Sequence, residues 1–248
     1  MKCVILAGGY AKRMWPLTKR IPKPMLKVGD KPIIEHIMER LETLEEIEEI
    51  HISTNEKFKR DFERWLEGFK TKKSVKIIAE PTTKEEEKFG SIGALRYLIE
   101  TEGIDDDLLV IGGDNLFDLD LTEFLNYFLQ KKTPVVAFQD VGDVNIVRKR
   151  FGTGILDENL RIIGFEEKPE NPTSTLASTC IYIFPKETLK MIHKYIEEQN
   201  NPDAAGQFIK WLSEKMHVHG FVFNGRWFDI GSFEMWERAK KEFVGKDN

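Results

Sequence analysis

The sequence of 248 residues has only two cysteines, Cys3 and Cys180, and both lie in apolar, strand-like runs. Such sparse use is typical of reduced core thiols and argues against a disulfide-stabilised secreted scaffold. Long apolar runs are lacking too, since no stretch approaches the roughly 18 residues that a membrane span needs. We therefore expect a cytoplasmic protein with no membrane partner.

A net positive charge is also missing, because 37 Lys and Arg residues face 42 Asp and Glu residues and give a formal net charge of −5. Nucleic-acid-binding domains are usually basic, so this balance predicts no nucleic-acid partner. The five histidines form no cluster with the spacing of a zinc site. Against this background residues 12–27 stand out, because they hold six cations and no acid.

Strand-like and helix-like segments alternate through the first half of the chain. The strand-like runs are residues 2–7, 47–54, 74–80, 107–115 and 133–141, and the helix-like segments between them are 32–44, 56–69, 91–100 and 121–130. This alternation predicts an α/β fold with a three-layer, Rossmann-like and mostly parallel sheet. Ligands of such sheets bind beyond the carboxyl ends of the strands.

The pattern changes after residue 141, where strand-like segments become more frequent. We expect a hairpin at 152–169, a strand at 175–185, helices at 186–199 and 203–216, a strand pair ending at 225–232 and a closing helix from 233. No linker or repeat interrupts the chain, so residues 1–248 are predicted to form one domain with an inserted β-rich lobe.

Two glycines, Gly8 and Gly9, directly follow the first apolar strand, where a phosphate cradle would lie. Glycine has no Cβ, so backbone N–H groups there can approach a phosphate closely. The loop lacks the Gly-Lys-Ser/Thr ending of an ATPase loop and the G-x-G-x-x-G spacing of a dinucleotide fold. From these residues alone, a simple strand-to-helix turn with surface lysines remains the alternative.

The whole stretch LAGGYAKRMWPLTKRIPKPML, residues 6–26, resembles the signature of the sugar-1-phosphate nucleotidyltransferases, also called nucleotide-sugar pyrophosphorylases. The matching residues are Leu6, Ala7, Gly8, Gly9, Arg13, Met14, Pro16, Leu17, Thr18, Pro22, Lys23, Pro24, Met25 and Leu26. Two positions depart from the pattern, because Ala11 replaces a third glycine and Lys12 replaces Thr or Ser.

Later segments resemble the same family in the same order, over residues 2 to about 236. LVIGGDN (109–115) resembles the metal-binding strand end, and FGTGILDENLRIIGFEEKP (151–169) resembles the block that ends in Glu-Lys-Pro. TLASTCIYIF (175–184) resembles the sugar-side strand, with Cys180 in place of a glycine. GRWFDIGS (225–232) resembles the segment that carries a second metal ligand.

The resemblance implies Mg2+-dependent transfer of a nucleoside monophosphate from a nucleoside triphosphate to a sugar 1-phosphate, with release of pyrophosphate. It implies a nucleotide-binding half at 1–141, a sugar-binding half with the second metal ligand at 142–231, and a closing helix at 232–248. The implied catalytic residues are Arg13, Lys23 and Asp114, and the implied Mg2+ ligands are Asp114 and Asp229. The implied nucleotide-binding residues are Leu6, Ala7, Gly8, Gly9, Lys12, Glu80, Gly90 and Gly113. The implied sugar-phosphate-binding residues are Gly152, Glu167, Lys168 and Thr179.

The base and the sugar stay open at this point. Glu80 and Gly90 match the family's base-reading positions, and Glu85 is a rival for the role of Glu80. The sequence has no hexapeptide-repeat β-helix, so it is nearest to short glucose-1-phosphate thymidylyl- or uridylyltransferases, with dTTP or UTP and a hexose 1-phosphate as substrates. Mannose- or heptose-1-phosphate guanylyltransferase is the alternative. An inactive regulatory subunit with this fold is the alternative of another class, and a homo-oligomer stays open.

Overall fold

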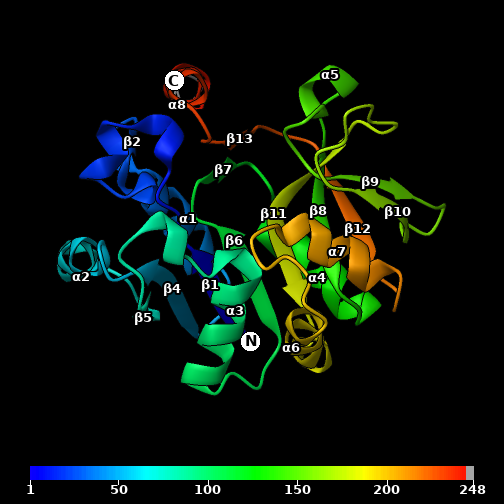
Figure 1. Ribbon diagram of the computed structural model, residues 1–248, viewed down its shortest axis with the longest axis horizontal. Coiled ribbons are helices and arrows are strands. Elements are labelled where there is room, and N and C mark those ends of the chain that lie inside the picture. The colour runs from blue at the N-terminus through cyan, green and yellow to red at the C-terminus, as the bar shows by residue number, and fades with distance from the viewer. Residues whose placement is uncertain (244–248) are drawn as a thin grey trace. The chain divides into compact units, whose positions relative to one another are not determined.

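The computed structural model describes residues 1–243 and divides them into two compact units (Figure 1). Unit 1 consists of Met1–Lys88, Ile111–Asp118 and the chain from Arg226. Unit 2 consists of Phe89–Val110 and Leu119–Gly225. Strand β6 (Leu108–Gly112) begins in unit 2 and ends in unit 1. The predicted closing segment at 232–248 lies partly outside the described residues.

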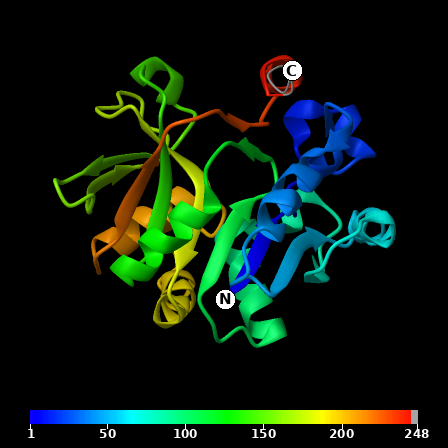
Figure 2. The ribbon, with the colours of Figure 1, turned by 180° about the vertical axis from the view of Figure 1, so that it is seen from behind.

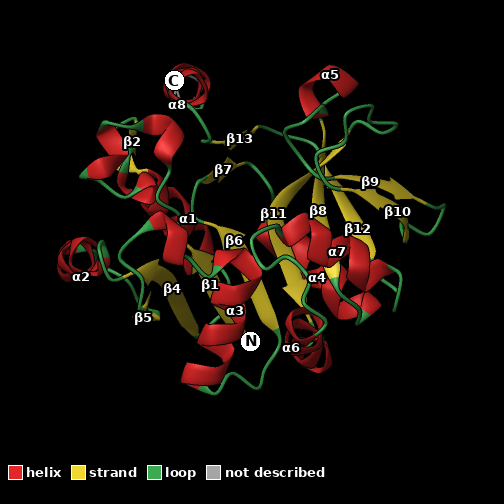
Figure 3. Ribbon diagram, in the orientation of Figure 1, coloured by secondary structure: helices red, strands yellow, loops and turns green. Residues whose placement is uncertain are grey.

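Unit 1 contains a parallel sheet and several short elements. Its helices and strands are β1 (Lys2–Leu6), β2 (Lys27–Val28), β3 (Lys31–Pro32), α1 (Ile33–Glu42), β4 (Glu49–Asn55), α2 (Lys59–Gly68), β5 (Ser74–Glu80), β7 (Asn115–Phe117), β13 (Trp227–Asp229) and α8 (Phe233–Glu242). Between β1 and β2 the chain forms three 3-10 turns, η1 (Lys12–Met14), η2 (Leu17–Lys19) and η3 (Lys23–Met25), drawn as helix beside β2 in Figure 3. The prediction placed no regular structure there.

Strands β1, β4 and β5 pair in parallel, as the alternating pattern predicted. Cys3, Val4 and Ile5 of β1 are completely buried, which accounts for the uninterrupted apolar run in the sequence. Leu6 lies opposite Ser53, and Asn55 lies opposite Glu80. The carboxyl ends of all three strands therefore meet at one edge, and the loop that begins at Ala7 starts from that edge.

A second, two-stranded sheet joins segments that are far apart in the sequence. β13 pairs antiparallel with β7, so that Asp229 lies opposite Asn115 and Trp227 lies opposite Phe117. The backbone N–H of Ile230 donates a hydrogen bond to the carbonyl of Asp114 at 3.0 Å. This pairing brings the two aspartates that the family resemblance singled out, Asp114 and Asp229, to the same place.

Unit 2 is richer in antiparallel pairing. Its elements are α3 (Gly90–Glu102), α4 (Leu121–Lys131), β8 (Val135–Asp140), α5 (Val144–Val147), β9 (Thr153–Leu156), β10 (Ile162–Glu166), β11 (Leu176–Phe184), α6 (Leu189–Glu197), α7 (Ala205–Ser213) and β12 (His219–Phe223). β9 and β10 form the predicted hairpin, and β11 pairs antiparallel with β8 and β9. The expected β-rich lobe is therefore present.

Helices cover both faces of the unit 2 strands. α7 lies over the face turned to the viewer in Figure 1, whereas α4 lies over the opposite face, which Figure 2 shows from behind. Four aromatic residues from β11, α6 and α7 contact one another edge to face or stacked, and these are Phe184, Tyr195, Phe208 and Trp211. This aromatic cluster fixes the position of α7 against its own unit.

The predicted strand pair at the end of the chain is wrong. β12 pairs in parallel with β8, and β13 pairs with β7, so the two strands are not partners of each other. Their closeness in sequence favoured a hairpin, but the chain from Gly225 to Arg226 passes from unit 2 into unit 1 between them.

Both cysteines are free thiols, as predicted, and Cys3 is completely buried. Among the described residues, no helix has the length and apolar character that crossing a membrane requires.

Candidate active site

The glycine loop of unit 1 follows the carboxyl end of β1 and is held by hydrogen bonds with β4. The backbone N–H of Ala7 donates to the carbonyl of Ser53 at 2.7 Å, and the Asn55 side chain donates to the carbonyl of Gly8 at 2.9 Å. A Cβ added at Gly9 would meet nothing within 4 Å. The backbone at Gly9 is thus open to a ligand, whereas Gly8 is anchored. Sequence reasoning missed Asn55, although its polar position at the end of β4 was a usable signal.

Glu80 ends β5 directly beneath this loop. It is 3% exposed, and a Cβ added at Gly8 would lie 2.8 Å from its Oε1 atom. Burial and the nearby Glu80 carboxylate raise the pKa of Tyr10, whose side chain belongs to the same loop. Glu85, the rival for the base-reading role, instead pairs with Lys88 at 3.1 Å. Glu80 therefore lies directly against the glycine loop, whereas Glu85 reaches it only through its charge, which also helps to raise the pKa of Tyr10.

The cationic segment continues from the loop through the three 3-10 turns. Arg13 is exposed in η1, and Lys12 forms an exposed ion pair with Glu86 at 3.0 Å between Nζ and Oε1. Lys23 begins η3 between two buried prolines, Pro22 and Pro24. Because each proline fixes one backbone torsion, Lys23 is held in a stiff segment.

Lys23, Asp114 and Asp229 form the charged centre of unit 1. The Lys23 Nζ atom lies 2.5 Å from the Asp114 Oδ2 atom, and both side chains are largely buried. Burial disfavours the charge on Lys23, but Asp114 and Asp229 outweigh it and the pKa of Lys23 is raised. Arg13 opposes this shift through its own positive charge, so it lies within electrostatic reach of Lys23.

Asn115 and Trp227 hold Asp114 in place. The Asn115 amide donates to the Asp114 Oδ1 atom and to the carbonyl of Gly112, each at 3.1 Å. The Trp227 indole N–H donates to the Asn115 Oδ1 atom at 2.6 Å across the β7–β13 pair. The remaining oxygen of Asp114 faces Lys23. Neither Asn115 nor Trp227 was assigned a role from the sequence, although both lie inside recognised motifs.

The residues of this centre suit a hard divalent cation. Asp114 and Asp229 offer carboxylate oxygens, which Mg2+ prefers, and no soft sulfur or imidazole ligand belongs to the pair. Phosphate oxygens and water complete the coordination of Mg2+ in many nucleotide enzymes. The donor set thus fits the predicted metal, with Lys23 balancing the two negative charges.

Unit 2 contributes a separate group around Glu167, directly after β10. Burial raises the pKa of the Glu167 carboxyl, and Lys168, whose Nζ atom lies 3.6 Å away, offsets the effect only in part. A Cβ added at Gly152 would lie 2.8 Å from the Glu167 Oε2 atom. The structure therefore brings Gly152, Glu167 and Lys168 together, as the motif implied.

Three other predicted residues have a structural explanation of their own. The Thr179 hydroxyl donates to the carbonyl of Ala137 at 2.9 Å and is buried. Gly113 lies against Leu6, to whose carbonyl its N–H donates at 2.9 Å. Gly90 has a φ of +76° in unit 2, and a Cβ there would lie 2.4 Å from the Cα of Asp203. Their ligand-binding roles stay predictions.

Two of the three departures from the family pattern, those at which glycine is replaced, occur at left-handed backbone positions. Ala11 has a φ of 47° and Cys180 has a φ of 59°. This left-handed region favours glycine, which is the residue that the pattern expects at both places. The Ala11 carbonyl accepts a hydrogen bond from the buried Thr18 hydroxyl at 2.8 Å, which stabilises the loop in this conformation.

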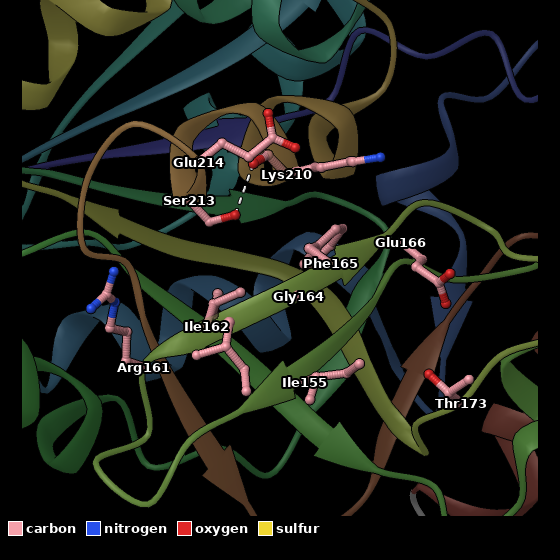
Figure 4. A pocket seen from close by; sticks show the side chains of 11 residues that line it. Ile155, Arg161, Ile162, Gly164, Phe165, Glu166, Thr173, Lys210, Ser213 and Glu214 are labelled. Atoms are coloured by element: carbon pink, nitrogen blue, oxygen red, sulfur yellow. Dashed lines mark hydrogen bonds between the residues drawn. The ribbon is translucent and has the colours of Figure 1, made fainter.

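A cavity of about 560 Å³ lies between β10 and α7 of unit 2 (Figure 4). Its lining residues are Ile155, Arg161, Ile162, Ile163, Gly164, Phe165, Glu166, Thr173, Lys210, Ser213 and Glu214. None of these is a predicted site residue. Glu166 faces this cavity, whereas the next residue, Glu167, lies against Gly152 and Gly206.

Comparison with known proteins identifies the family. Residues 2–244 match the family named Nucleotidyl transferase, and the chain belongs to it. The bifunctional protein GlmU of Methanocaldococcus jannaschii is 33% identical and covers 100% of this chain, which spans only 55% of that protein. A Sulfolobus acidocaldarius protein, provisionally named mannose-1-phosphate guanyltransferase, is 28% identical over 98% of this chain and 63% of its own length.

A solved structure from Bacillus anthracis, provisionally named glucose-1-phosphate thymidylyltransferase, has the same fold. Its TM-score is 0.82 at 28% identity, and the match covers 100% of this chain and 96% of that one. The predicted α/β fold class and the predicted resemblance to nucleotidyltransferases are thus confirmed. The chain spans about half the length of the GlmU relative.

The buried Glu167 predicts a pH-dependent gain in stability for Glu167→Gln. A carboxyl whose pKa is raised by folding contributes stability that is fully present below its unfolded pKa of 4.5 and is lost as pH rises through the folded value. We therefore expect Glu167→Gln to unfold at a higher temperature than the wild type at pH 7, with a smaller difference at pH 4. Thermal unfolding measured by circular dichroism at both pH values tests this.

The neighbouring exposed carboxylate supplies the matched control. Glu166→Gln is expected to change the unfolding temperature equally little at pH 4 and pH 7, because Glu166 is exposed. A lower unfolding temperature for Glu167→Gln than for the wild type at pH 7 would contradict the raised pKa of the Glu167 carboxyl.

Proposed function

We propose that this chain transfers a nucleoside monophosphate from a nucleoside triphosphate to a sugar 1-phosphate and releases pyrophosphate. The observation that carries the proposal is the centre formed by Lys23, Asp114 and Asp229. Gly113 links it to the glycine loop, because a Cβ there would lie 2.9 Å from the Leu6 carbonyl and 3.2 Å from Pro24. Membership of the nucleotidyl transferase family supports the same reaction class.

Both substrates are anions and repel each other, and the cationic residues of unit 1 can offset this repulsion. An oxygen of the sugar phosphate attacks the α-phosphorus, the bond to the bridging oxygen breaks, and pyrophosphate leaves with the electron pair. Lys23 would stabilise the α-phosphoryl group, and Arg13 would hold the leaving pyrophosphate with its planar guanidinium. Asp114 and Asp229 would hold Mg2+, which supplies charge neutralisation at the phosphates. The attacking phosphate is already ionised, so no general base is required.

Unit 2 would bind the sugar phosphate. Glu167 would accept hydrogen bonds from sugar hydroxyls, since an ionised carboxylate offers acceptors only. Lys168 would pair with the sugar phosphate, since its side chain is more than half exposed and so accessible. Gly152 directly precedes β9, which pairs with β10, and Thr179 lies in β11, the next strand of the sheet.

For the substrates, we propose a hexose 1-phosphate and dTTP or UTP. Glu80 beneath the glycine loop can accept from the N3–H of thymine or uracil. A glucose-1-phosphate thymidylyltransferase is the provisional name of the solved Bacillus anthracis structure. The same acceptor suits the N1–H of guanine, and the Sulfolobus relative carries the name of a mannose-1-phosphate guanyltransferase. Guanylyl transfer to mannose or heptose 1-phosphate is therefore the second candidate.

An inactive regulatory subunit is the remaining alternative. Such a subunit would be expected to lack a metal-binding aspartate or the catalytic Arg and Lys residues. Arg13, Lys23, Asp114 and Asp229 are all present in the sequence. The carboxylates and the ammonium also meet in the structure. Both observations favour the enzyme.

Asp114→Asn is expected to reduce turnover at least about a hundredfold while the fold is retained. The substitution keeps the size of the side chain but removes the charge that faces Lys23 and the metal, and loss of one key electrostatic group has effects of this scale. Steady-state pyrophosphate release with the preferred substrate pair measures it. Asp30→Asn, at an exposed turn of the same unit, is the control and should keep wild-type turnover. Wild-type turnover in Asp114→Asn would remove Asp114 from the reaction.

Glu80→Gln is expected to change base preference more than sugar preference. The ratio of kcat/KM between pyrimidine and guanine nucleotides should shift at least about tenfold, because a carboxylate can accept from both the N1–H and the N2–H of guanine, whereas an amide offers one acceptor oxygen, which is enough for the N3–H of a pyrimidine. Ratios between sugar phosphates should stay within about twofold. Glu85→Gln is the matched control, since this carboxylate pairs with Lys88. A shift in base preference caused by Glu85→Gln, and not by Glu80→Gln, would move the base pocket to the loop that follows β5.

A further inference from the structure

We propose that Gly206 is a positioning residue of the sugar site, which acts by seating the carboxylate of Glu167. This inference rests on the proposed function. Gly206 is the second residue of α7, and no motif in the sequence drew attention to it. It acts on the reaction only through Glu167 and is not itself expected to touch the sugar.

The geometry leaves no room for any side chain at this position. A Cβ built on Gly206 would lie 1.8 Å from the Glu167 Oε2 atom and 2.8 Å from its carboxyl carbon. Real Cβ atoms essentially never approach another heavy atom within 3.0 Å. The same Oε2 atom lies 2.8 Å from the corresponding position on Gly152. The carboxylate therefore occupies a slot between two glycines that come from different elements.

Glycine is required at position 206 because a side chain would clash with Glu167, and not because of the backbone conformation. Gly206 lies within a regular helix, and its φ is not in the left-handed region where glycine is otherwise favoured. In addition, α7 has no side-chain cap, because Ala204 precedes it. The first turn of a helix has N–H groups without partners in the helix and a positive dipole end. The Glu167 carboxylate lies at this first turn. The raised pKa of Glu167 shows that burial outweighs any such attraction for its charge.

Contacts with α3 hold the segment just before α7, so the helix cannot easily move away from Glu167. The backbone N–H of Ile92 donates to the carbonyl of Pro202 at 2.8 Å. Close contact between Gly90 and Asp203 fixes the same stretch, since a Cβ on Gly90 would lie 2.4 Å from the Asp203 Cα. The far end of the Glu167 side chain is flexible by comparison. A side chain added at Gly206 would therefore move the carboxylate of Glu167 and leave the helix in place.

Gly206→Ala tests the inference through a split between kinetic constants. We expect the KM for the sugar 1-phosphate to rise at least about tenfold and the KM for the nucleoside triphosphate to stay within about twofold. The unfolding temperature should change by only a few degrees, because the clash is relieved by a side-chain rotation. Gly164→Ala, in the neighbouring strand β10, is the control, since its added Cβ would lie 3.4 Å from Ile155 and needs no rearrangement. An unchanged KM for the sugar 1-phosphate in Gly206→Ala would overturn the proposal.

A double-mutant cycle with Glu167→Ala separates positioning from a general structural effect. If Gly206 acts through Glu167, adding Gly206→Ala to Glu167→Ala should change the KM for the sugar by less than about twofold. Equal losses in both backgrounds would overturn the positioning role. Wild-type protein that releases no pyrophosphate would contradict the proposed function separately. In that case calorimetric binding of glucose 1-phosphate still decides the inference, which is overturned unless the wild type binds and Gly206→Ala binds at least about tenfold more weakly.

Discussion

The charge balance among Lys23, Asp114 and Asp229 is the constraint on which the candidate active site depends. Two carboxylates brought together out of water repel each other unless a cation is shared between them. The Lys23 ammonium, 2.5 Å from Asp114, supplies that charge, and Asp229 adds to its raised pKa. A centre of this kind suits phosphates and a metal ion. The two carboxylates can bind the cation, and the Lys23 ammonium can then pair with phosphate oxygens instead of with Asp114.

Three elements that are distant in sequence must cooperate to build this centre. Lys23 depends on the proline-flanked turn η3, Asp114 on the end of β6, and Asp229 on strand β13. The Trp227–Asn115 hydrogen bond spans 112 positions and joins the last two. Arg226 adds a second tie, since its guanidinium donates to the Asp118 carboxylate at 2.7 Å. The rigidity of the acidic pair thus comes from hydrogen bonds outside it.

Local patterns made much of this predictable. The buried runs of β1 and β4, the half-buried strand β5, the hairpin of β9 and β10, and the helical spacing of α2, α6 and α7 are all readable from the sequence. The pairing of β13 with β7 is not, because it depends on contacts between remote segments that no local period encodes. The same holds for Asn55, Asn115 and Gly206. Their roles come from contacts with residues remote in sequence or specific to the fold, namely Gly8, Asp114 and Glu167. Ala11 and Cys180 show the converse, because motif comparison identified both positions and the structure supplied the reason, a left-handed backbone.

The central claim is nucleotidyl transfer to a sugar 1-phosphate, and pyrophosphate release tests it most directly. We would measure release with Mg2+ across UTP, dTTP, GTP, CTP and ATP, each paired with glucose, mannose, galactose and N-acetylglucosamine 1-phosphates. The account predicts one strongly preferred pair, with release abolished when Mg2+ is chelated. Folded protein that releases no pyrophosphate with any pair would contradict it and favour the inactive-subunit alternative.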